Sequence, residues 1–161
     1  MGEPWRVRKV VSGGQTGADI GGLLAARELG IETGGVAPQG WWTEEGSRES
    51  LLRGFGLVEC DEAGYPARTR QNVLQSDGTL LVGSYESGGS AFTNAVAKDA
   101  DKPVFYIAAS PSASIEASQV AAFQEWLEMH RIGILNVAGN RESNNPGIQE
   151  FTRRFLLSAM R

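Results

Sequence analysis

Short runs of β-branched residues alternate along this chain with longer segments in which apolar residues recur at helical spacing. This alternation is typical of βαβ units, in which helices cover both faces of a mostly parallel sheet. We expect strands at residues 8–11, 31–38, 56–60, 79–84, 104–108 and 133–139. We expect helices at residues 17–29, 68–75, 90–100, 115–131 and 146–160, with mostly irregular chain at 37–56 and a polar linker at 110–114. The predicted fold class is therefore α/β, with a doubly wound sheet in a three-layer arrangement.

Size and charge restrict the class of protein. The 161 residues are 41% hydrophobic, which suits a single domain over residues 1–161 with one core. The net charge of −4 lacks the basic excess of a nucleic-acid-binding protein, and no apolar segment is long enough for a signal peptide or a membrane span. Cys60 is the only cysteine and His130 the only histidine, which excludes an internal disulfide and a Cys/His metal site. We expect a cytoplasmic protein without a nucleic-acid or membrane partner.

A glycine turn joins the first predicted strand to the first predicted helix. Gly13 and Gly14 allow positive φ and close approach of a ligand to the backbone, and a helix N-terminus attracts anions. The other interpretation is structural, because Thr16 and Asp19 have the spacing of a capping-box variant and Gly-Gly commonly separates strand and helix. The candidate ligand-binding residues of this turn are Ser12, Gly13, Gly14, Gln15, Thr16 and Gly17.

Two common nucleotide-binding motifs do not fit this turn. A Walker loop requires Gly-Lys-Ser/Thr, but the chain has no lysine between Lys9 and Lys98. A dinucleotide-binding fold favours an acidic residue at the end of the second strand, where this chain has Val36, Ala37 and Pro38. We therefore expect no NAD cofactor.

The chain repeats the Ser-Gly-Gly sequence after the predicted strand at 79–84. If the strand order is 3-2-1-4-5, the first and fourth strands are neighbours, and both turns face one crevice at the carboxyl ends of the strands. The simpler interpretation is that Ser90 caps the helix and Thr93 places a hydroxyl in its first turn. The candidate ligand-binding residues here are Ser87, Gly88, Gly89, Ser90 and Thr93.

Two further segments supply candidates for the same ligand. Arg68 has a guanidinium suited to a phosphate or another oxyanion, and Asn72 lies one helical turn later. Asn140 and Arg141 follow the last predicted strand, where they can form a wall or lid. The alternative for Arg68 and Asn72 is a helix surface that faces solvent. The alternative for Arg141 is a surface or subunit contact.

Five blocks of sequence occur in an order that resembles the molybdenum-cofactor carrier family: SGGQTGAD, GGVAPQGWWTEEG, RTRQNVLQSDGTLLV, SGGSAFT and LNVAGNRES. That family belongs to a Rossmann-like superfamily that also contains the LOG phosphoribohydrolases and the Smf-type DNA-processing proteins. The resemblance runs from Lys9 to Phe155. It implies a Rossmann-like sheet of order 3-2-1-4-5 with an additional strand, and a homo-oligomer, either a dimer or a tetramer. It also implies a small anionic ligand, either the molybdenum cofactor (molybdopterin) or a nucleotide.

The resemblance favours binding over catalysis. In LOG enzymes the second glycine turn continues as Pro-Gly-Gly-x-Gly-Thr-x-x-Glu, but here no carboxylate follows until Asp99. Cleavage of an N-glycosidic bond typically recruits a carboxylate. We therefore expect a carrier-like binding protein without catalytic residues or a metal held by side chains. The alternatives are a nucleotide phosphoribohydrolase using Glu86 or Asp19, and a nucleotide sensor.

The adjacent Trp41 and Trp42 are difficult to place together in a core. One interpretation is a surface that stacks on a pterin or purine, and the other is an oligomer interface.

Overall fold

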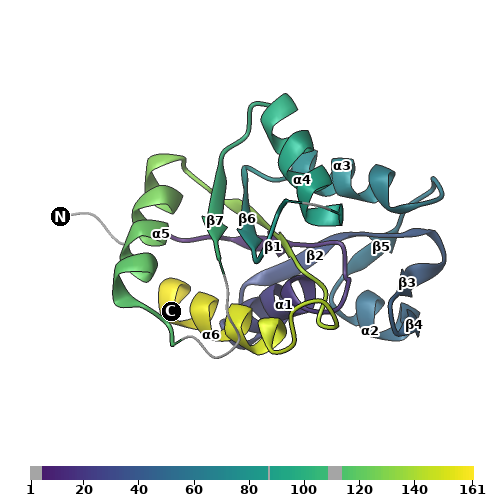
Figure 1. Cartoon of the computed structure of the whole chain (residues 1–161), viewed down its shortest axis with the longest axis horizontal. Helices are drawn as coiled ribbons and strands as arrows, with labels where there is room; N and C mark the ends of the chain where they lie inside the picture. The colour runs from purple at the N-terminus through teal and green to yellow at the C-terminus, as the bar shows by residue number, and fades with distance from the viewer. Residues whose placement is uncertain (1–4, 87, 109–113) are drawn as a thin grey trace.

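The computed structural model describes residues 5–86, 88–108 and 114–161 (Figure 1). Within these residues, the main sheet has six strands in the order β5-β2-β1-β8-β6-β7, and every neighbouring pair is parallel. The strands are β1 (Lys9–Val11), β2 (Glu32–Ala37), β5 (Leu57–Glu59), β6 (Gly78–Val82), β7 (Val104–Ile107) and β8 (Ile134–Gly139). The predicted α/β class with a mostly parallel sheet is confirmed.

Helices cover both faces of this sheet. They are α1 (Ala18–Glu28), α2 (Glu49–Gly54), α3 (Tyr65–Gln75), α4 (Gly88–Asp99), α5 (Ala117–Met129) and α6 (Ile148–Met160). Figure 1 shows α3 and α4 on one side of the sheet and α1 and α6 on the other, with α5 packed against α6. Among the described residues, no helix is both long and apolar enough to cross a membrane.

The main core lies between the sheet and the layer formed by α1, α5 and α6. Val10, Leu80 and Leu135 are fully buried on three neighbouring strands. From the helices, the rings of Phe123 and Phe155 meet at a centroid distance of 5.4 Å. Burial of these aliphatic and aromatic side chains is the main favourable term that holds the layers together.

The predicted strand order is wrong in one respect, because β8 lies between β1 and β6 and separates the two strands expected to be neighbours. Val10 of β1 aligns with Leu135 of β8, and Leu80 of β6 aligns with Val137. The physical reason is burial, since residues Leu135–Val137 are almost completely inaccessible on both faces of the sheet. At an edge of the sheet, β8 would leave one row of backbone hydrogen-bonding groups without a partner strand.

The segment at 37–56, predicted as mostly irregular, contains short regular elements. They are a 3₁₀ turn, η1 (Gln39–Trp41), a hairpin formed by β3 (Trp42–Thr43) and β4 (Gly46–Ser47), and the helix α2. Trp41 is 3% exposed and packs into a second core cluster with Leu52 and Phe55, whereas Trp42 is 56% exposed. Neither surface interpretation therefore applies to Trp41, because the backbone directs only one of the two indoles outward.

Candidate functional site

A cavity of about 700 Å³ opens at the carboxyl ends of β1, β8 and β6. This is the edge at which doubly wound sheets bind their ligands. The cavity is lined by residues of the two glycine turns, of α3 and α4, and of β8 with the loop that follows it: Gly13, Gln15, Asp19, Tyr65, Pro66, Arg68, Thr69, Asn72, Ser84, Gly88, Gly89, Ser90, Phe92, Thr93, Asn136, Ala138, Gly139, Asn140, Arg141 and Asn144. Both glycine turns therefore contribute to one cavity, although β8 separates their strands.

Within the first glycine turn, several backbone N–H groups bond to neighbouring side chains. The Gly14 N–H donates to the Ser12 hydroxyl at 3.3 Å, and the Gln15 N–H donates to the Asp19 carboxylate at 3.1 Å. Gly17 is tightly enclosed, because a Cβ there would lie 2.3 Å from the carbonyl oxygen of Asn140, and its φ of +83° also favours glycine. The Asp19 carboxylate thus already places a negative charge near the start of α1.

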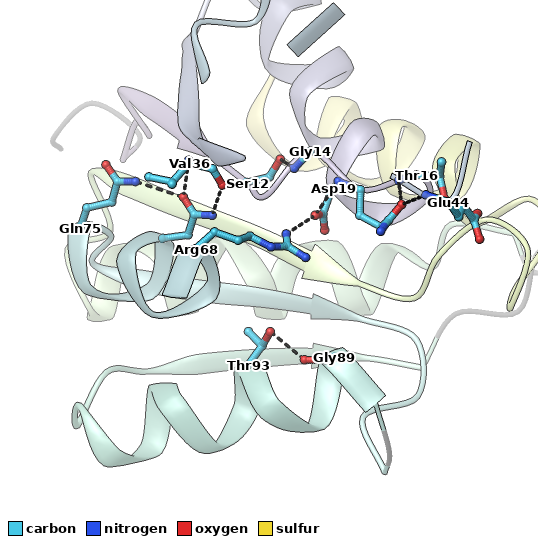
Figure 2. A network of polar contacts seen from close by, with 12 residues as sticks. Ser12, Gly14, Thr16, Asp19, Val36, Glu44, Arg68, Gln75, Gly89 and Thr93 are labelled. Carbon is cyan, nitrogen blue, oxygen red and sulfur yellow. Dashed lines mark hydrogen bonds and ion pairs between the residues drawn. The ribbon is translucent and has the colours of Figure 1, made fainter. Parts of the chain in front are cut away.

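An ion pair crosses this turn. Arg68 Nη1 of α3 lies 3.4 Å from Asp19 Oδ2, and Figure 2 shows the two side chains directed toward one another. The guanidinium lies so close to the turn that a Cβ on Gly13 would overlap Nη1, at 1.4 Å. Burial raises the pKa of the Asp19 carboxyl to about 6, although Arg68 and the N–H groups of Gln15 and Gly13 act in the opposite direction.

Two nitrogen donors of this wall are buried without an acceptor among the described residues. The Gln15 amide oxygen accepts the N–H groups of Thr16 and Glu44 at 3.1 and 2.9 Å, which fixes the orientation of the amide. Gln15 is 6% exposed, and its Nε2 has no hydrogen-bond partner in the described part of the chain. The same is true of Arg68 Nε. A buried donor without an acceptor costs about 1–3 kcal/mol, so an acceptor that reaches these two groups from the cavity would stabilise them.

The second glycine turn is open. Among the described residues, a Cβ added at Gly88 or Gly89 would meet no atom within 4 Å, and both glycines line the cavity at the start of α4. The Thr93 hydroxyl donates to the carbonyl oxygen of Gly89 at 3.0 Å, as drawn in Figure 2, which is a bond within the helix. Ser90 is buried at the same wall, whereas Ser87 lies outside the described residues.

Asn72 lies on the cavity wall, but its amide is engaged elsewhere. Its Nδ2 donates to the carbonyl oxygen of Val36 at 3.0 Å, and its Oδ1 accepts the N–H of Val36 at 2.8 Å. These two bonds attach α3 to the end of β2. They occupy the backbone groups of Val36 that a neighbouring strand would otherwise pair with. Arg68 lies one turn earlier on the same helix, so these bonds hold the part of α3 that carries Arg68.

The loop after β8 forms the wall that separates the two turns. The side chain of Asn140 accepts the Ser84 N–H at 2.9 Å and donates to the Ser84 carbonyl oxygen at 2.8 Å, which joins this loop to the end of β6. The guanidinium of Arg141 lies 5.8 Å from the centroid of the Tyr65 ring, and that of Arg68 lies 5.1 Å from it. Two cations therefore approach one aromatic ring at this cavity.

Sequence reasoning missed several residues of this region. Glu44, in the turn of the β3–β4 hairpin, accepts hydrogen bonds from the hydroxyls of Thr16 and Ser143, and Figure 2 shows Glu44 beside Thr16. Asn136 of β8 lines the cavity and donates to the Thr79 hydroxyl at 3.2 Å. The signal for Asn136 was a polar residue within an apolar strand, whereas no local spacing connects Glu44 to residues 28 and 99 positions away.

Comparisons with known proteins agree with this architecture. The family described as the circularly permutated YpsA SLOG family matches residues 10–160. A crystal structure of a "Putative molybdenum carrier protein" from Syntrophus aciditrophicus SB is 35% identical to this chain and superposes with a TM-score of 0.89, covering 99% of this chain and 98% of that one. No curated protein sequence matches.

Proposed function

This chain belongs to the circularly permutated YpsA family of SLOG proteins, and from that premise we propose that it is a molybdenum-carrier-like protein that binds a small anionic ligand between its two glycine turns. The ligand lies in the cavity at the carboxyl ends of β1, β8 and β6. Arg68 and Gln15 contact its oxyanion group, and the open start of α4 faces the same space.

The observation that carries this proposal is the pair of buried donors without an acceptor, Gln15 Nε2 and Arg68 Nε, within the described part of the chain. An oxyanion supplies the lone pairs that these nitrogens lack. A neutral apolar ligand of the same size would leave both donors unsatisfied. The two donors therefore support a ligand that supplies acceptors, and the guanidinium of Arg68 favours a negatively charged one.

The size of the cavity favours more than a bare ion. A volume of about 700 Å³ falls within the range of pockets for nucleotide-sized or pterin-sized molecules. Tyr65, Pro66 and Phe92 add apolar surface to the polar wall, which suits a heterocycle carrying a phosphate. The two ligand classes that combine these features here are a nucleotide and the molybdenum cofactor.

The residues fit the cofactor through its phosphate and not through its metal. Among residues 5–86, 88–108 and 114–161, no group of three or more His, Cys, Asp or Glu side chains could hold a metal ion. Cys60, the one thiol of the chain, is buried outside the cavity lining, beside Gln71. The cofactor supplies its own sulfur ligands to molybdenum, so this chain needs only to bind the anionic group.

The test replaces the donor at Gln15 without changing its size. In Gln15→Glu, one carboxylate oxygen can still accept the N–H groups of Thr16 and Glu44, whereas the other replaces Nε2 and repels an anion. Gln71→Glu is the matched control, because it makes the same charge change on an exposed part of α3 outside the cavity. We expect isothermal titration with AMP, molybdate and phosphate to detect binding to the wild type and to Gln71→Glu, and none to Gln15→Glu. Equal binding by all three proteins would contradict the proposal.

A second candidate function is hydrolysis of a nucleotide, and the observation that favours it is Asp19. A buried carboxyl with its pKa raised to about 6 on a cavity wall has the properties of a general acid. Glu86, the other carboxylate considered, is exposed and does not line the cavity. Release of adenine from AMP by the wild type, and its loss in Asp19→Asn, would establish this activity by chromatography.

A further inference from the structure

We propose that Asp19 is the internal counter-anion of the cavity: a dianionic oxyanion takes Arg68 over from Asp19, and Asp19 binds one proton from solvent as the ligand enters. This inference rests on the proposed function, because it concerns the same cavity. It assigns to Asp19 a role in selecting the charge of the ligand.

The geometry of the ion pair shows that Arg68 is only partly engaged. A single contact of 3.4 Å joins Nη1 to Asp19 Oδ2, whereas a guanidinium can form two parallel bonds of less than about 3 Å with an oxyanion. Arg68 Nε is buried and has no acceptor within the described residues. Arg68 therefore retains the donors that a tighter, bidentate partner would use.

Asp19, by contrast, retains other partners when Arg68 leaves it. Its carboxyl group accepts the backbone N–H groups of Gln15 and Gly13, and both bonds lie within the glycine turn. The side chain stays in place at the start of α1 whether or not it pairs with Arg68. When Arg68 transfers to the ligand, the charge that faces Asp19 changes from the positive guanidinium to the negative ligand.

The other charged groups around α1 do not replace Arg68. On the hairpin, Glu44 bonds to Thr16 and Ser143, and β8 has no charged residue. The remaining charged groups on elements packed against α1 bond to other partners or lie away from Asp19. Lys9 and Glu32 pair between β1 and β2, and Glu142 bonds to the N–H groups of Gly147 and Gln149. On α6, Arg153 pairs with Glu150 and with Glu28 at the far end of α1, and Arg154 lies near Glu150. Arg141 lines the cavity itself, where it can only attract the ligand.

An ionised Asp19 and a dianion in the same buried cavity would repel one another. Protonation of Asp19 removes the repulsion, and burial has already raised the pKa of this carboxyl to about 6, so the proton is readily acquired near neutral pH. The incoming negative charge raises this pKa further. Ligand binding and proton binding are therefore coupled, and each strengthens the other.

The coupling predicts that affinity depends on pH because the protein, and not the ligand, changes its protonation. Molybdate is a suitable probe, because its charge stays at −2 between about pH 6.5 and 8.5. We expect the affinity of the wild type to rise by up to about tenfold for each pH unit lowered across this range, with the uptake of up to about one proton per site. The proton uptake is measured by titration calorimetry in buffers that differ in ionisation enthalpy, and it requires no variant.

Asp19→Asn supplies the complementary measurement. An asparagine can still accept a hydrogen bond in the turn but carries no charge, so we expect pH-independent binding that is about 100-fold tighter than the wild type near pH 8. Binding by the wild type with neither proton uptake nor a pH slope, or a slope that persists in Asp19→Asn, would overturn the role of Asp19 and leave the proposed function intact. Absence of binding of molybdate, phosphate and AMP at every pH would overturn both.

Discussion

The amide oxygen of Gln15 accepts the backbone N–H of Glu44 at 2.9 Å, which attaches the β3–β4 hairpin to the first glycine turn. The Glu44 carboxylate strengthens this attachment, because it accepts the hydroxyls of Thr16 and Ser143 and the N–H of Ser143. The hydrogen bonds from Ser143 and Thr16 hold the pKa of Glu44 below its ordinary value. The hairpin therefore keeps Gln15 in the orientation that leaves Nε2 free for a ligand.

The hairpin attachment predicts the effect of Glu44→Gln. This change removes the charge from three hydrogen bonds. We expect a loss of only about 1 kcal/mol in the free energy of unfolding at pH 7, since Glu44 is exposed and solvent weakens each bond. The folded-state pKa of Glu44 is lowered, so its contribution is present above the unfolded value of 4.5 and is lost as pH falls through the lower folded value. Urea denaturation at pH 7 and near pH 3 measures both effects.

Glu45→Gln is the control for this experiment. Glu45 occupies the same turn and is exposed, and its carboxylate pairs with the half-buried Arg48 at 2.6 Å. Such surface pairs contribute little, so we expect a change of less than about 0.5 kcal/mol. Equal losses in the two variants would mean that the hairpin is not attached through Glu44.

Asp19 gives a pH dependence of stability with the opposite sign. Its pKa is raised from an ordinary value of 3.8 to about 6, so the folded state holds the proton more tightly than the unfolded state. The associated stability is complete below about pH 4 and is lost as pH rises through about 6, by about 3 kcal/mol at about 1.4 kcal/mol per pKa unit. Asp19→Asn has no titratable carboxyl at this position, so its free energy of unfolding lacks this dependence on pH. The difference in unfolding free energy between variant and wild type should therefore shift by about 3 kcal/mol in favour of the variant between pH 4 and 7. A difference that is independent of pH would show that Asp19 titrates normally.

The open start of α4 predicts a variant that fills the cavity without unfolding the chain. In Gly89→Val the new side chain meets no atom at its Cβ, and Gly89 has no positive φ, so the backbone is not strained. We expect an unchanged melting temperature within a few degrees and at least a tenfold loss of affinity for AMP, measured by titration calorimetry.

Gly54→Val is the matched control for Gly89→Val, because Gly54 lies at the exposed end of α2 and does not line the cavity. We expect it to bind AMP as the wild type does. Unchanged affinity in Gly89→Val as well would place the ligand away from the second glycine turn.

The sequence was sufficient to predict the class of fold and about half of the residues that line the cavity, because strand ends and helix starts are local signals. The repeated Ser-Gly-Gly turns, Arg68 and Asn140 all follow from such signals. The position of β8 could not be read in this way, since the order of parallel strands depends on which long-range packing buries the most surface. Leu135 and Val137 look the same in the sequence whether their strand is central or lies at an edge.

Trp41 and Asn72 show a second limit. The pair Trp41-Trp42 looked like an exposed surface, but the positive φ of Trp41, +62°, turns its indole into the core. Asn72 was predicted to face a ligand, and helical spacing does place it on the cavity side of α3. Its partner is the backbone of Val36, which no helical periodicity could reveal.

The two bonds between Asn72 and Val36 predict that Asn72→Leu is destabilising and impairs binding. Leucine has a similar volume, but it leaves the buried N–H and carbonyl groups of Val36 without partners, so we expect a loss of about 2–4 kcal/mol in unfolding free energy. Because Asn72 fixes α3 at the turn that follows Arg68, affinity for molybdate should fall as well, measured under conditions in which the variant remains folded. Gln71→Leu, on the exposed side of the same helix, is the control and should leave both quantities nearly unchanged. If Asn72→Leu lost stability but bound molybdate normally, Asn72 would anchor the helix without positioning Arg68.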